Sequence, residues 1–359
     1  MLLKTLENMY GYFVARRNAE FDAGKRAIID VKIPVISVGN VSAGGTGKTP
    51  FVQLLARELL KNSVSPAIVS RGYRRKSKGE VVVSDGTDIL TNVEKAGDEL
   101  MMLAESLSVA VIAHSDRAAG AQTALRIFKE REDVIREIYG DAAEKRFLKK
   151  CIILDDGFQH RKLARGLDIV LIDKETLGRP YLLPRGRLRE PLESLKRADV
   201  IVLMNGAQEF VLKSTIGENL LKENCVIVEA RTVAGEFYNM YSRREFNNDP
   251  FKNGAVAVSG IAKPERFLKT VETRNVRVLH HFGFKDHHWF SGNDVAKIVK
   301  KCVVLKTKTV VTTEKDAVKL RQFGKEFADH EITVAVLPVR TEISKGRDEF
   351  LKRIMEIFD

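Results

Sequence analysis

The sequence predicts an α/β fold: a mostly parallel, doubly wound sheet of the P-loop NTPase type, followed by a second, smaller α/β domain. Short and nearly continuous runs of Val, Ile and Leu recur from Ile33 onward, as expected of strands buried on both faces of a parallel sheet. Helical stretches fall between many of these runs, which is the pattern of repeated βα units. A glycine-rich segment at residues 37–50, SVGNVSAGGTGKTP, follows the first run and has the composition of a phosphate-binding loop.

An amphipathic helix is expected at residues 1–27, ahead of the first strand. Apolar residues at spacings of three and four give it one broad apolar face, formed by Leu2, Leu3, Leu6, Met9, Tyr10, Phe13 and Val14. Four basic residues follow this face, namely Arg16, Arg17, Lys25 and Arg26. The helix either docks on the protein's own core or lies on an acidic membrane surface.

A nucleotide-binding domain is expected over residues 28–230. Its strands are predicted at Val35–Val38, Ala67–Ser70, Val81–Ser84, Ala110–Ala113, Ile152–Leu154, Ile169–Ile172, Val200–Leu203 and Val226–Val228. Helices are predicted between them, for instance at Phe51–Leu60 and Glu99–Leu107. Residues 231–253 are polar and rich in turn-forming residues, so we interpret them as a linker.

The second α/β domain is expected over residues 254–359. Its strands are predicted at Ala255–Ser259, Arg277–His281, Val310–Thr313 and Ile332–Leu337. Its helices are predicted at Pro264–Glu272, Asn293–Cys302, Asp316–Phe323 and Arg347–Phe358.

The composition is that of a folded globular protein with a basic surface. A chain of 359 residues is long enough for two domains with a sizeable core in each. Hydrophobic residues make up 44% and charged residues 30% of the chain, and the net charge is +12. A basic surface favours anionic partners, such as nucleic acid, phosphorylated small molecules or an acidic membrane leaflet. Charge by itself does not choose among them.

The three cysteines, Cys151, Cys225 and Cys302, are far apart and form no C-x-x-C pair. We interpret them as reduced, mostly buried thiols, which favours a reducing cytoplasm over a disulfide or metal role. The sequence has no evident secretory signal, and no apolar run approaches the ~18 residues that a membrane span needs. The protein is therefore not expected to cross a bilayer.

The segment at residues 37–50 is a candidate P-loop. In such a loop, backbone N–H groups surround the phosphates, a Lys contacts the β- and γ-phosphates, and a Ser or Thr hydroxyl binds Mg²⁺. Lys48 and Thr49 fill these two side-chain roles, and the loop is formed by Ser42, Ala43, Gly44, Gly45, Thr46, Gly47, Lys48 and Thr49. Ser42 stands where the motif has its first glycine, so a purely structural turn remains the alternative.

A pair of carboxylates, Asp155 and Asp156, follows the strand predicted at Ile152–Leu154. An acid at the end of a buried strand is the usual partner of a P-loop, where it holds or positions Mg²⁺. A helix cap or turn is the alternative for these two residues. Their combination with the candidate P-loop favours the metal role.

Other polar residues follow neighbouring strands, at the edge of the sheet where open α/β folds bind ligands. They form four groups: residues 70–73 (SRGY), 97–99 (GDE), 114–117 (HSDR) and 159–161 (QHR). Taken together, they predict a polar and charged site at one sheet edge.

These motifs, in this order, resemble the tetraacyldisaccharide 4′-kinases, the membrane-associated lipid A 4′-kinases of Gram-negative bacteria. The resemblance rests on SVGNVSAGGTGKTP, SRGY, GDE, HSDR, LDDGFQHRKLARGLDIVLID, LLPRGRLREP, SGIAKPERF, FKDHHWF and TTEKDAVKL, and it extends from the N-terminal helix to Leu320. The family also places a small residue other than Gly at the first position of the loop. Ser42 therefore fits the family, and the resemblance favours a true nucleotide site.

The resemblance implies the reaction and its location. The family transfers the γ-phosphoryl group of ATP to the 4′-hydroxyl of an acylated glucosamine disaccharide 1-phosphate. It has a larger P-loop domain and a smaller α/β domain joined by a hinge ribbon. Its N-terminal helix contacts the membrane, which implies a peripheral location on the cytoplasmic face of the bacterial inner membrane. The implied partners are a lipid substrate and an anionic membrane surface, and no nucleic acid.

The resemblance also implies roles for individual residues. Lys48 would hold the phosphates, Thr49, Glu99 and Asp155 would bind Mg²⁺, and Asp98 would activate the sugar hydroxyl with support from His287. Whether Asp155 or Asp156 contacts the metal stays open, and Asp156 is counted among the catalytic residues. Five further residues match family positions in the same cleft and are expected to bind substrate: Arg71, Tyr73, Arg117, Gln159 and His160.

Three alternatives remain open. A regulatory or energy-transducing NTPase would also use a P-loop, but the string TEKD at residues 313–316 has the wrong spacing for the Asn-Lys-x-Asp motif of GTPases. A nucleic-acid-binding protein would fit the basic charge, but no aromatic-basic motif is present. The His pairs at 280–281 and 287–288 would suit a metal, although they lack Cys partners and an H-E-x-x-H pattern. The charged residues 129–150, expected to form a solvated helix, are longer than the corresponding connection in compact family members.

Overall fold

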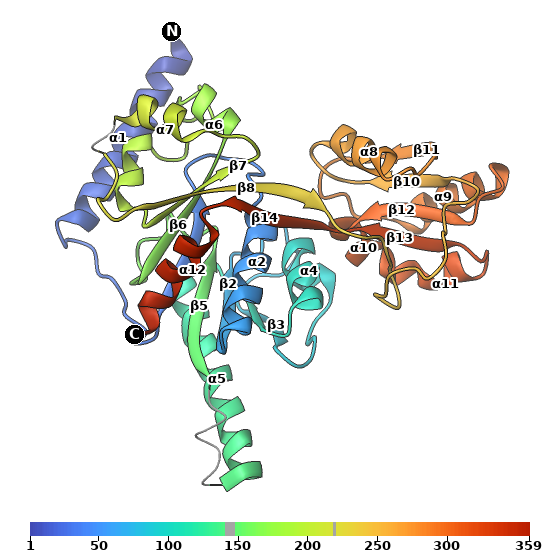
Figure 1. Ribbon diagram of the computed structural model, residues 1–359, viewed down its shortest axis with the longest axis horizontal. Coiled ribbons are helices and arrows are strands. Elements are labelled where there is room, and N and C mark those ends of the chain that lie inside the picture. Colours follow the sequence, from blue (N-terminus) through green and yellow to red (C-terminus); the bar gives the residue numbers. More distant parts are fainter. Residues whose placement is uncertain (141–147, 218–219) are drawn as a thin grey trace.

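The structure is a computed structural model that describes residues 1–140, 148–217 and 220–359. A long N-terminal helix, α1 (Leu2–Asp22), lies beside a large domain built on a nine-stranded sheet, and a smaller domain contains a five-stranded sheet. Figure 1 shows the two domains side by side, with α1 on the side of the large domain that faces away from the small one. This is the α/β class with two domains that the sequence predicts.

The large sheet has the strand order β14-β8-β7-β6-β1-β5-β2-β4-β3. Its strands are β1 (Val35–Asn40), β2 (Val64–Ser70), β3 (Val81–Asp85), β4 (Ala110–Ala113), β5 (Lys149–Asp155), β6 (Leu167–Asp173), β7 (Val200–Met204), β8 (Val226–Ala234) and β14 (Val339–Lys345). All pairs are parallel except those at the two edges, where β3 pairs antiparallel with β4 and β14 antiparallel with β8. The parallel strands therefore have their carboxyl ends at one edge of the sheet.

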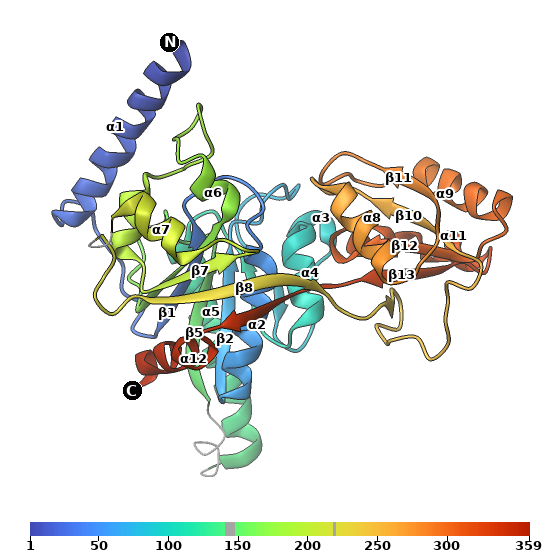
Figure 2. The ribbon, with the colours of Figure 1, turned by 45° about the horizontal axis from the view of Figure 1, so that its top comes forward.

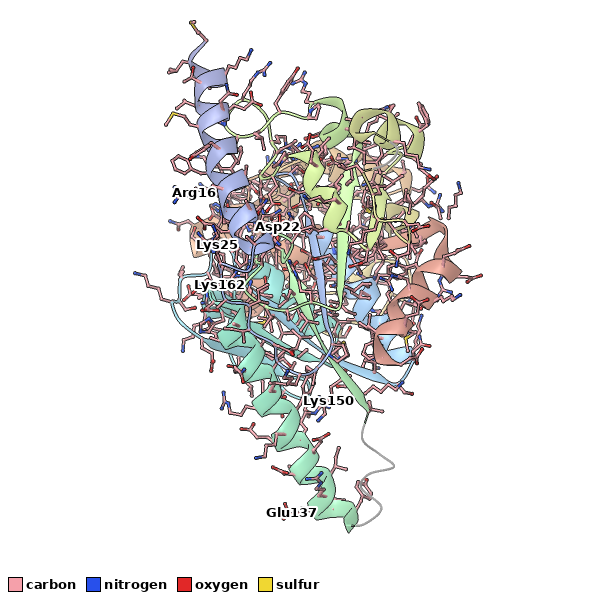
Figure 3. All side chains as sticks on the ribbon, turned by 90° about the vertical axis from the view of Figure 1, so that its left-hand side faces the viewer. Arg16, Asp22, Lys25, Glu137, Lys150 and Lys162 are labelled. Atoms are coloured by element: carbon pink, nitrogen blue, oxygen red, sulfur yellow. The ribbon has the colours of Figure 1, made fainter. Side chains whose placement is uncertain are left out.

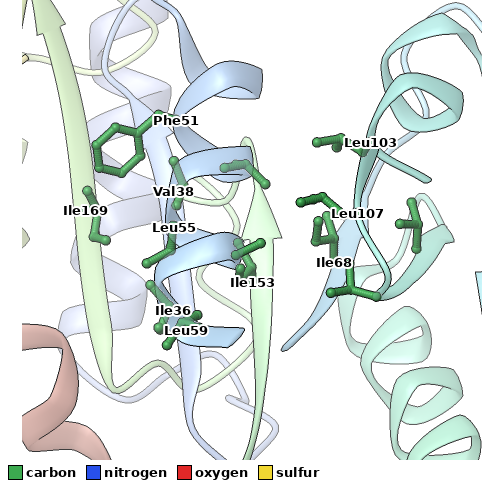
Figure 4. Packing of buried hydrophobic residues seen from close by; sticks show 14 of the residues in the cluster. Ile36, Val38, Phe51, Leu55, Leu59, Ile68, Leu103, Leu107, Ile153 and Ile169 are labelled. Atoms are coloured by element: carbon green, nitrogen blue, oxygen red, sulfur yellow. The ribbon is translucent and has the colours of Figure 1, made fainter. Parts of the chain in front are cut away.

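Helices cover both faces of the large sheet, which explains the continuous apolar runs. On one face Ile36 and Val38 of β1 pack with α2 (Lys48–Lys61), α4 (Asp98–Ser106) and α12 (Arg347–Met355), and Figure 4 shows this packing around Phe51 and Leu55. On the other face Val35 packs with α5 (Arg117–Tyr139). The same face carries α6 (Lys174–Gly178) and α7 (Glu209–Ile216) farther along the sheet. Successive residues of one strand thus enter two different cores.

The smaller domain is a five-stranded sheet of order β11-β10-β12-β13-β9. Its strands are β9 (Tyr238–Asn239), β10 (Ala255–Ser259), β11 (Val278–Gly283), β12 (Thr309–Thr313) and β13 (Thr333–Leu337). Helix α8 (Pro264–Thr273) packs on one face, and α9 (Gly292–Val304), α10 (Glu314–Leu320) and α11 (Gly324–Ala328) pack on the other. Every strand and helix predicted for residues 255–337 is present, with bounds that differ by a few residues.

The C-terminal 21 residues do not belong to the domain in which the sequence analysis places them. The strand β14, which the sequence analysis does not predict, pairs with β8 from Val339 to Lys345, and α12 packs on the large sheet. The chain therefore returns from the small domain to the large one, whereas the sequence places all of residues 254–359 in the small domain. Strand β8 also extends into the interval expected as a linker, since it continues to Ala234. Figures 1 and 2 show β8 and β14 running together from the large domain toward the small one.

The N-terminal helix α1 is docked on the large domain through a buried carboxylate. The Glu190 side chain is fully buried, and it accepts hydrogen bonds from Arg17 at 2.7 Å, Asn18 at 3.3 Å and Arg197 at 2.6 Å. Removing either side of such a buried ionic network is costly, because the partner charge is left unpaired. The same helix leaves a row of apolar side chains exposed, namely Leu2, Leu3, Leu6, Met9, Tyr12 and Phe13. Docking therefore accounts for only part of its apolar surface.

Helix α5 contains the first part of the charged residues 129–150. The helix extends to Tyr139 and projects from the body of the large domain with Glu137 near its tip (Figure 3). Residues 141–147 of this segment lie outside the described part of the chain, and β5 begins at Lys149.

Two other expectations concern the membrane and the cysteines. Among the described residues, no helix combines the length and the apolar character that crossing a bilayer requires. All three cysteines are free thiols, with Cys151 and Cys302 buried and Cys225 partly buried. Burial raises the pKa of Cys225 to about 11 and that of Cys302 to about 12, so both are protonated at neutral pH.

Candidate functional site

The candidate P-loop lies between the end of β1 and the start of α2. Gly47, with a φ of 88°, is the residue before the helix, and Lys48 and Thr49 are its first two residues. The first N–H groups of a helix have no partner within the helix, and the helix dipole adds partial positive charge at this end. The arrangement of strand, glycine-rich loop and helix N-terminus is that of an anion-binding site, as the sequence predicts.

Side chains from outside the loop hold it in shape. Asn40 donates from Nδ2 to Thr46 Oγ1 at 3.0 Å, and Thr176 donates to Ser42 Oγ at 3.0 Å. The backbone of Ala43 is bonded on both sides by Arg187, whose carbonyl accepts from Ala43 N at 2.6 Å and whose Nε donates to Ala43 O at 2.9 Å. Ser42, which stands where the motif has its first glycine, is thus buried and takes part in the contacts that hold the loop.

Asp156 is the acid that the cations of the site neutralise. Its Oδ1 lies 3.3 Å from Lys48 Nζ, and Arg189 donates to both of its oxygens at 3.0 and 2.8 Å. Burial opposes ionisation of Asp156, but Lys48 and Arg189 outweigh it and lower the pKa of the carboxyl. Asp156 is therefore ionised, and it holds Lys48 beside the loop.

Asp155 lies in a different electrostatic environment, although it is the neighbouring residue. It is buried, and Ser70 donates to its Oδ2 at 2.9 Å. Burial, together with the negative charges of Glu99 and Asp156, raises its pKa to about 6. A carboxylate whose pKa is raised by neighbouring carboxylates has a deficit of positive charge around it. Of the two acids, Asp155 is the one that a bound cation would stabilise.

Glu99 brings a third oxygen ligand close to the loop. Its Oε2 accepts from Thr49 Oγ1 at 3.4 Å, and its other oxygen is paired with Lys315 of the small domain. Thr49, Glu99 and Asp155 thus present a hydroxyl and two carboxylates, a set that suits Mg²⁺, which typically takes one or two protein carboxylates plus phosphate oxygens and water. Among the described residues, no group of three or more His, Cys, Asp or Glu side chains is arranged as metal ligands.

Asp98 and His287 meet across the two domains. Asp98 is the first residue of α4 in the large domain, and its Oδ2 lies 2.8 Å from His287 Nδ1. Burial of Asp98 opposes its ionisation, but the bond from His287 and the charge of Lys315 prevail and lower the pKa to about 2. Because an ionised carboxylate can only accept, Nδ1 of His287 carries the hydrogen. The two residues are 189 positions apart in the sequence and form one hydrogen-bonded pair.

The loop that carries His287 is held by both domains. Within the small domain, His287 N donates to Gly260 O at 2.9 Å. From the large domain, Arg74 donates to the carbonyl of Asp286 at 2.9 Å, and the Lys76 ammonium lies 4.7 Å from the ring centre of Trp289. The position of the imidazole is therefore set by the contact between the domains.

The five residues expected to bind substrate differ in their contacts and in their exposure. Tyr73 places its ring 5.7 Å from the His287 ring, and the residue is exposed. Gln159 donates to the carbonyl of Asn40 at 2.9 Å and so supports the end of β1. Arg71 is exposed, and its charge contributes to lowering the pKa of Arg117.

Arg117 is buried and His160 is partly buried. Burial lowers the pKa of the Arg117 guanidinium, whereas the nearby Asp155 and Asp156 raise it. Burial and the charge of Arg117 lower the pKa of His160 to about 4, so this imidazole is neutral. His160 Nε2 is buried and has no hydrogen-bond partner among the described residues.

The sequence analysis did not assign three cationic residues that the structure brings into the site. Arg189 pairs with Asp156, Lys315 with Glu99, and Lys319 lies 3.4 Å from Asp98 Oδ2. All three belong to quoted motifs, LLPRGRLREP and TTEKDAVKL, and basic residues in such motifs are a signal that could have been used. Their acidic partners are too far away in the sequence to be identified from spacing.

The histidine pairs do not converge on one point. His281 Nε2 lies 2.9 Å from Ser259 Oγ, and His288 Nε2 lies 3.1 Å from Asp294 Oδ2. His287 faces Asp98, and the His280 ring contacts Phe282. The geometry thus assigns these side chains to separate contacts and gives no support to a metal site formed by them.

The whole chain is similar to one protein family. Residues 1–357 match the family described as tetraacyldisaccharide-1-P 4′-kinase, LpxK. A tetraacyldisaccharide 4′-kinase of Chlorobium luteolum is 38% identical over 99% of this chain and 98% of its own length. The tetraacyldisaccharide 4′-kinase of Halothermothrix orenii is 36% identical, over 95% of this chain and 88% of its own length.

A solved structure agrees with the sequence comparisons. The crystal structure of LpxK from Aquifex aeolicus, described as an "apo" form in complex with ATP, superposes with a TM-score of 0.73. The two proteins share 32% sequence identity, and the similarity covers all of both chains. The likeness therefore includes both domains and the ribbon between them.

The shape of the phosphate loop predicts different effects for two neighbouring glycines. A Cβ at Gly44 would lie 1.9 Å from Arg187 Nη2, at a φ of 117°, and Arg187 is tied to Ala43 and Glu175. Gly44→Ala should therefore lower the free energy of unfolding by about 1–3 kcal/mol, measured by urea denaturation. A Cβ at Gly45 would meet no atom within 4 Å, so Gly45→Ala is the matched control. Equal losses in the two variants would contradict the described loop.

Proposed function

The chain belongs to the tetraacyldisaccharide-1-P 4′-kinase family, and from this premise we propose the reaction and the roles of its residues. The protein is a kinase of lipid A biosynthesis. It transfers the γ-phosphoryl group of ATP to the 4′-hydroxyl of a tetraacyl glucosamine disaccharide 1-phosphate. The observation that carries the assignment of roles is the 2.8 Å contact between Asp98 and His287, because it joins the second domain to the P-loop domain at the candidate site.

Lys48 and the loop residues 42–49 bind the ATP phosphates. The α2 N-terminus and the Lys48 ammonium both face the negative charge that develops on the transferred group, where preorganised charge has its largest effect. Asp156 holds Lys48 at 3.3 Å, and Arg189 balances the second carboxylate oxygen. We propose that Asp156 positions Lys48, since the carboxylate oxygens of Asp156 are already paired with two cations.

Thr49, Glu99 and Asp155 are the residues that would hold Mg²⁺. When bound, the ion neutralises charge on the β- and γ-phosphates and orients the transferred group. The raised pKa of Asp155, about 6, supports its choice over Asp156, because the neighbouring negative charges leave Asp155 without enough compensating positive charge.

Asp98 accepts the proton of the attacking hydroxyl, and His287 orients it. Phosphoryl transfer needs little covalent chemistry from the protein beyond positioning, charge and a base directed at the nucleophile. With a pKa of about 2, Asp98 is ionised throughout the physiological range and ready to accept. His287 is held in the left-handed backbone region, with a φ of 61°, by the loop contacts that both domains provide.

The remaining residues of the cleft contact the substrates. Arg117 and the neutral, unpartnered His160 Nε2 lie in the buried part of the site and suit phosphate and hydroxyl groups. Arg71 and Tyr73 lie at its exposed side and suit the disaccharide headgroup. Family membership favours this kinase over the alternative of a P-loop switch or energy-transducing NTPase.

Helix α1 attaches the protein to the cytoplasmic face of the inner membrane. Leu2, Leu6, Met9 and Phe13 are exposed and follow one another at spacings of four, three and four, so they form one stripe along the helix. Figure 3 shows Arg16, Lys25 and Lys162 on the same side of the molecule, along the second half of α1. An exposed apolar stripe beside basic residues is the pattern of a helix that lies in an anionic membrane interface.

Incubation of the purified protein with ATP, Mg²⁺ and the disaccharide lipid in detergent tests the proposed function. The expected product is a lipid that has gained one phosphate, identified by thin-layer chromatography and mass spectrometry. Lys48→Ala should lower the rate by about 10²–10³-fold, because a charge that stabilises the transferred group is lost. Lys61→Ala, an exposed residue at the other end of α2, should leave the rate unchanged. Near-normal turnover by Lys48→Ala would exclude the P-loop assignment.

A double-mutant comparison tests the Asp98–His287 pair. Asp98→Ala should lower kcat by about 10²–10⁴-fold, the usual contribution of a general base, while ATP binding survives through Lys48 and Thr49. His287→Ala should have a smaller effect, because an unassisted carboxylate remains. The double variant should be little worse than Asp98→Ala alone, as expected of groups that act together. If the two losses multiply, the residues act independently and the pair is not a catalytic unit.

Sedimentation with vesicles tests the membrane role of α1. Deleting residues 1–27 would also remove Arg17 and Asn18 from buried Glu190, so substitution is the cleaner change. The triple variant Leu6→Gln/Met9→Gln/Phe13→Gln should lower the fraction that sediments with phosphatidylglycerol vesicles, while keeping the thermal midpoint. The control Val303→Gln/Val304→Gln removes equally exposed apolar residues from α9 of the small domain. A triple variant that binds vesicles like the wild type would restrict α1 to docking.

A further inference from the structure

We propose that Lys319 is a positioning residue for phosphoryl transfer, and that it acts by holding the Asp98 carboxylate from the opposite domain. The inference rests on the proposed function, in which Asp98 is the base. Lys319 lies in α10 of the small domain, its side chain is 1% exposed, and its Nζ is 3.4 Å from Asp98 Oδ2. Helix α10 packs directly against α4, the helix that begins with Asp98.

The two carboxylate oxygens of Asp98 have different hydrogen-bond partners. Oδ2 accepts from His287 Nδ1 at 2.8 Å and from Lys319 Nζ at 3.4 Å, both from the small domain. Within the described part of the chain, the hydrogen bond given to Oδ1 is the one from the backbone N–H of Glu99, at 2.9 Å. A carboxylate oxygen offers two lone-pair positions, so Oδ1 retains one for the attacking hydroxyl. Lys319 and His287 together fix which oxygen faces the substrate.

Lys319 is itself held by Asp316, which also supports the His287 loop. Lys319 Nζ lies 3.1 Å from Asp316 Oδ1. Asp316 Oδ2 accepts from Gly260 N at 2.9 Å and from Thr313 at 2.8 Å. The carbonyl of the same Gly260 accepts from His287 N at 2.9 Å. One buried carboxylate therefore sets the positions of both groups that contact Asp98 Oδ2.

The small domain does not need the contact with Asp98 to neutralise the charge of Lys319. The ammonium already has an ionic partner in its own domain, Asp316, and lies 5.7 Å from the ring centre of Phe290. Its approach to Asp98 crosses the domain interface, beside Val318 and Trp289, which pack on the core of the large domain. A cation that is paired within its domain and still reaches the catalytic carboxylate is placed to align that carboxylate when the domains are in contact.

The test compares two variants of Lys319 with a control variant in the full-length protein. Lys319→Met removes the charge at similar length and should lower kcat by about 10–100-fold, as expected for a displaced reacting group, with the KM for ATP changed less than about threefold. Lys319→Arg keeps the charge and should retain a higher kcat than Lys319→Met. Lys325→Met, an exposed lysine on α11, is the control and should match the wild type.

A combined variant separates positioning from stability. Lys319→Met leaves Asp316 buried without its cation, which should lower the thermal midpoint. Adding Asp316→Asn removes that uncompensated charge, and the remaining amide oxygen can still accept from Gly260 N and Thr313. The double variant should therefore regain the thermal midpoint but not kcat. Recovery of kcat together with the thermal midpoint would overturn the proposal, as would a normal kcat in Lys319→Met.

Tryptophan fluorescence gives a readout that does not need the reaction. The chain has one tryptophan, Trp289, which packs on the large domain beside Lys76. Lys319→Met and Asp98→Ala should both increase acrylamide quenching of Trp289, because each removes a contact that joins the domains. If the wild type fails to phosphorylate the lipid, the proposed function is wrong, and quenching still decides whether Lys319 and Asp98 join the domains. Unchanged quenching in Lys319→Met would overturn that link.

Discussion

The contact between the two domains depends on the buried carboxylate of Asp98. Asp98 is the first residue of α4 in the large domain, and two groups from the small domain, His287 and Lys319, converge on one of its oxygens. Both groups are held through the backbone of Gly260 or the side chain of Asp316. Because a buried charge is tolerated only when it is paired and hydrogen-bonded, the ionised Asp98 favours contact between the domains. Formation of the Asp98–His287 pair and contact between the domains therefore depend on each other.

The acidic residues of the candidate site lie in different electrostatic environments, although they are close together. Asp155 and Asp156 are neighbours, but Asp156 is paired with Lys48 and Arg189. Burial, followed by the charges of Glu99 and Asp156, raises the pKa of Asp155 to about 6. Glu99 has one oxygen paired with Lys315 and the other bonded to Thr49. The difference in pKa between the paired and the unpaired acids follows from these contacts, and it identifies where additional positive charge is needed.

The N-terminal helix is connected to the phosphate loop through one short segment of chain. Tyr10 of α1 donates to the carbonyl of Arg189 at 2.9 Å, and the buried Glu190 accepts from Arg17. The guanidinium of Arg189 reaches Asp156, and Arg187, two residues earlier, is bonded to the backbone of the loop at Ala43. The helix that carries the exposed apolar stripe is thus connected to the candidate site through residues 187–190.

The sequence by itself determined the fold class, the positions of most strands and helices, the phosphate loop and, through resemblance, the expected catalytic residues. These are local properties: apolar runs predict buried strands, and the glycine pattern with Lys48 and Thr49 identifies the loop. The strand β14 and its pairing with β8 were not predicted. VRTEISK alternates β-branched and polar residues, but its partner strand lies more than a hundred residues earlier, and local sequence does not identify so distant a partner. The convergence of Lys319 and His287 on Asp98 was likewise decided only by the tertiary structure. Ion pairs between domains depend on how α10 packs against α4, and no local spacing encodes that packing.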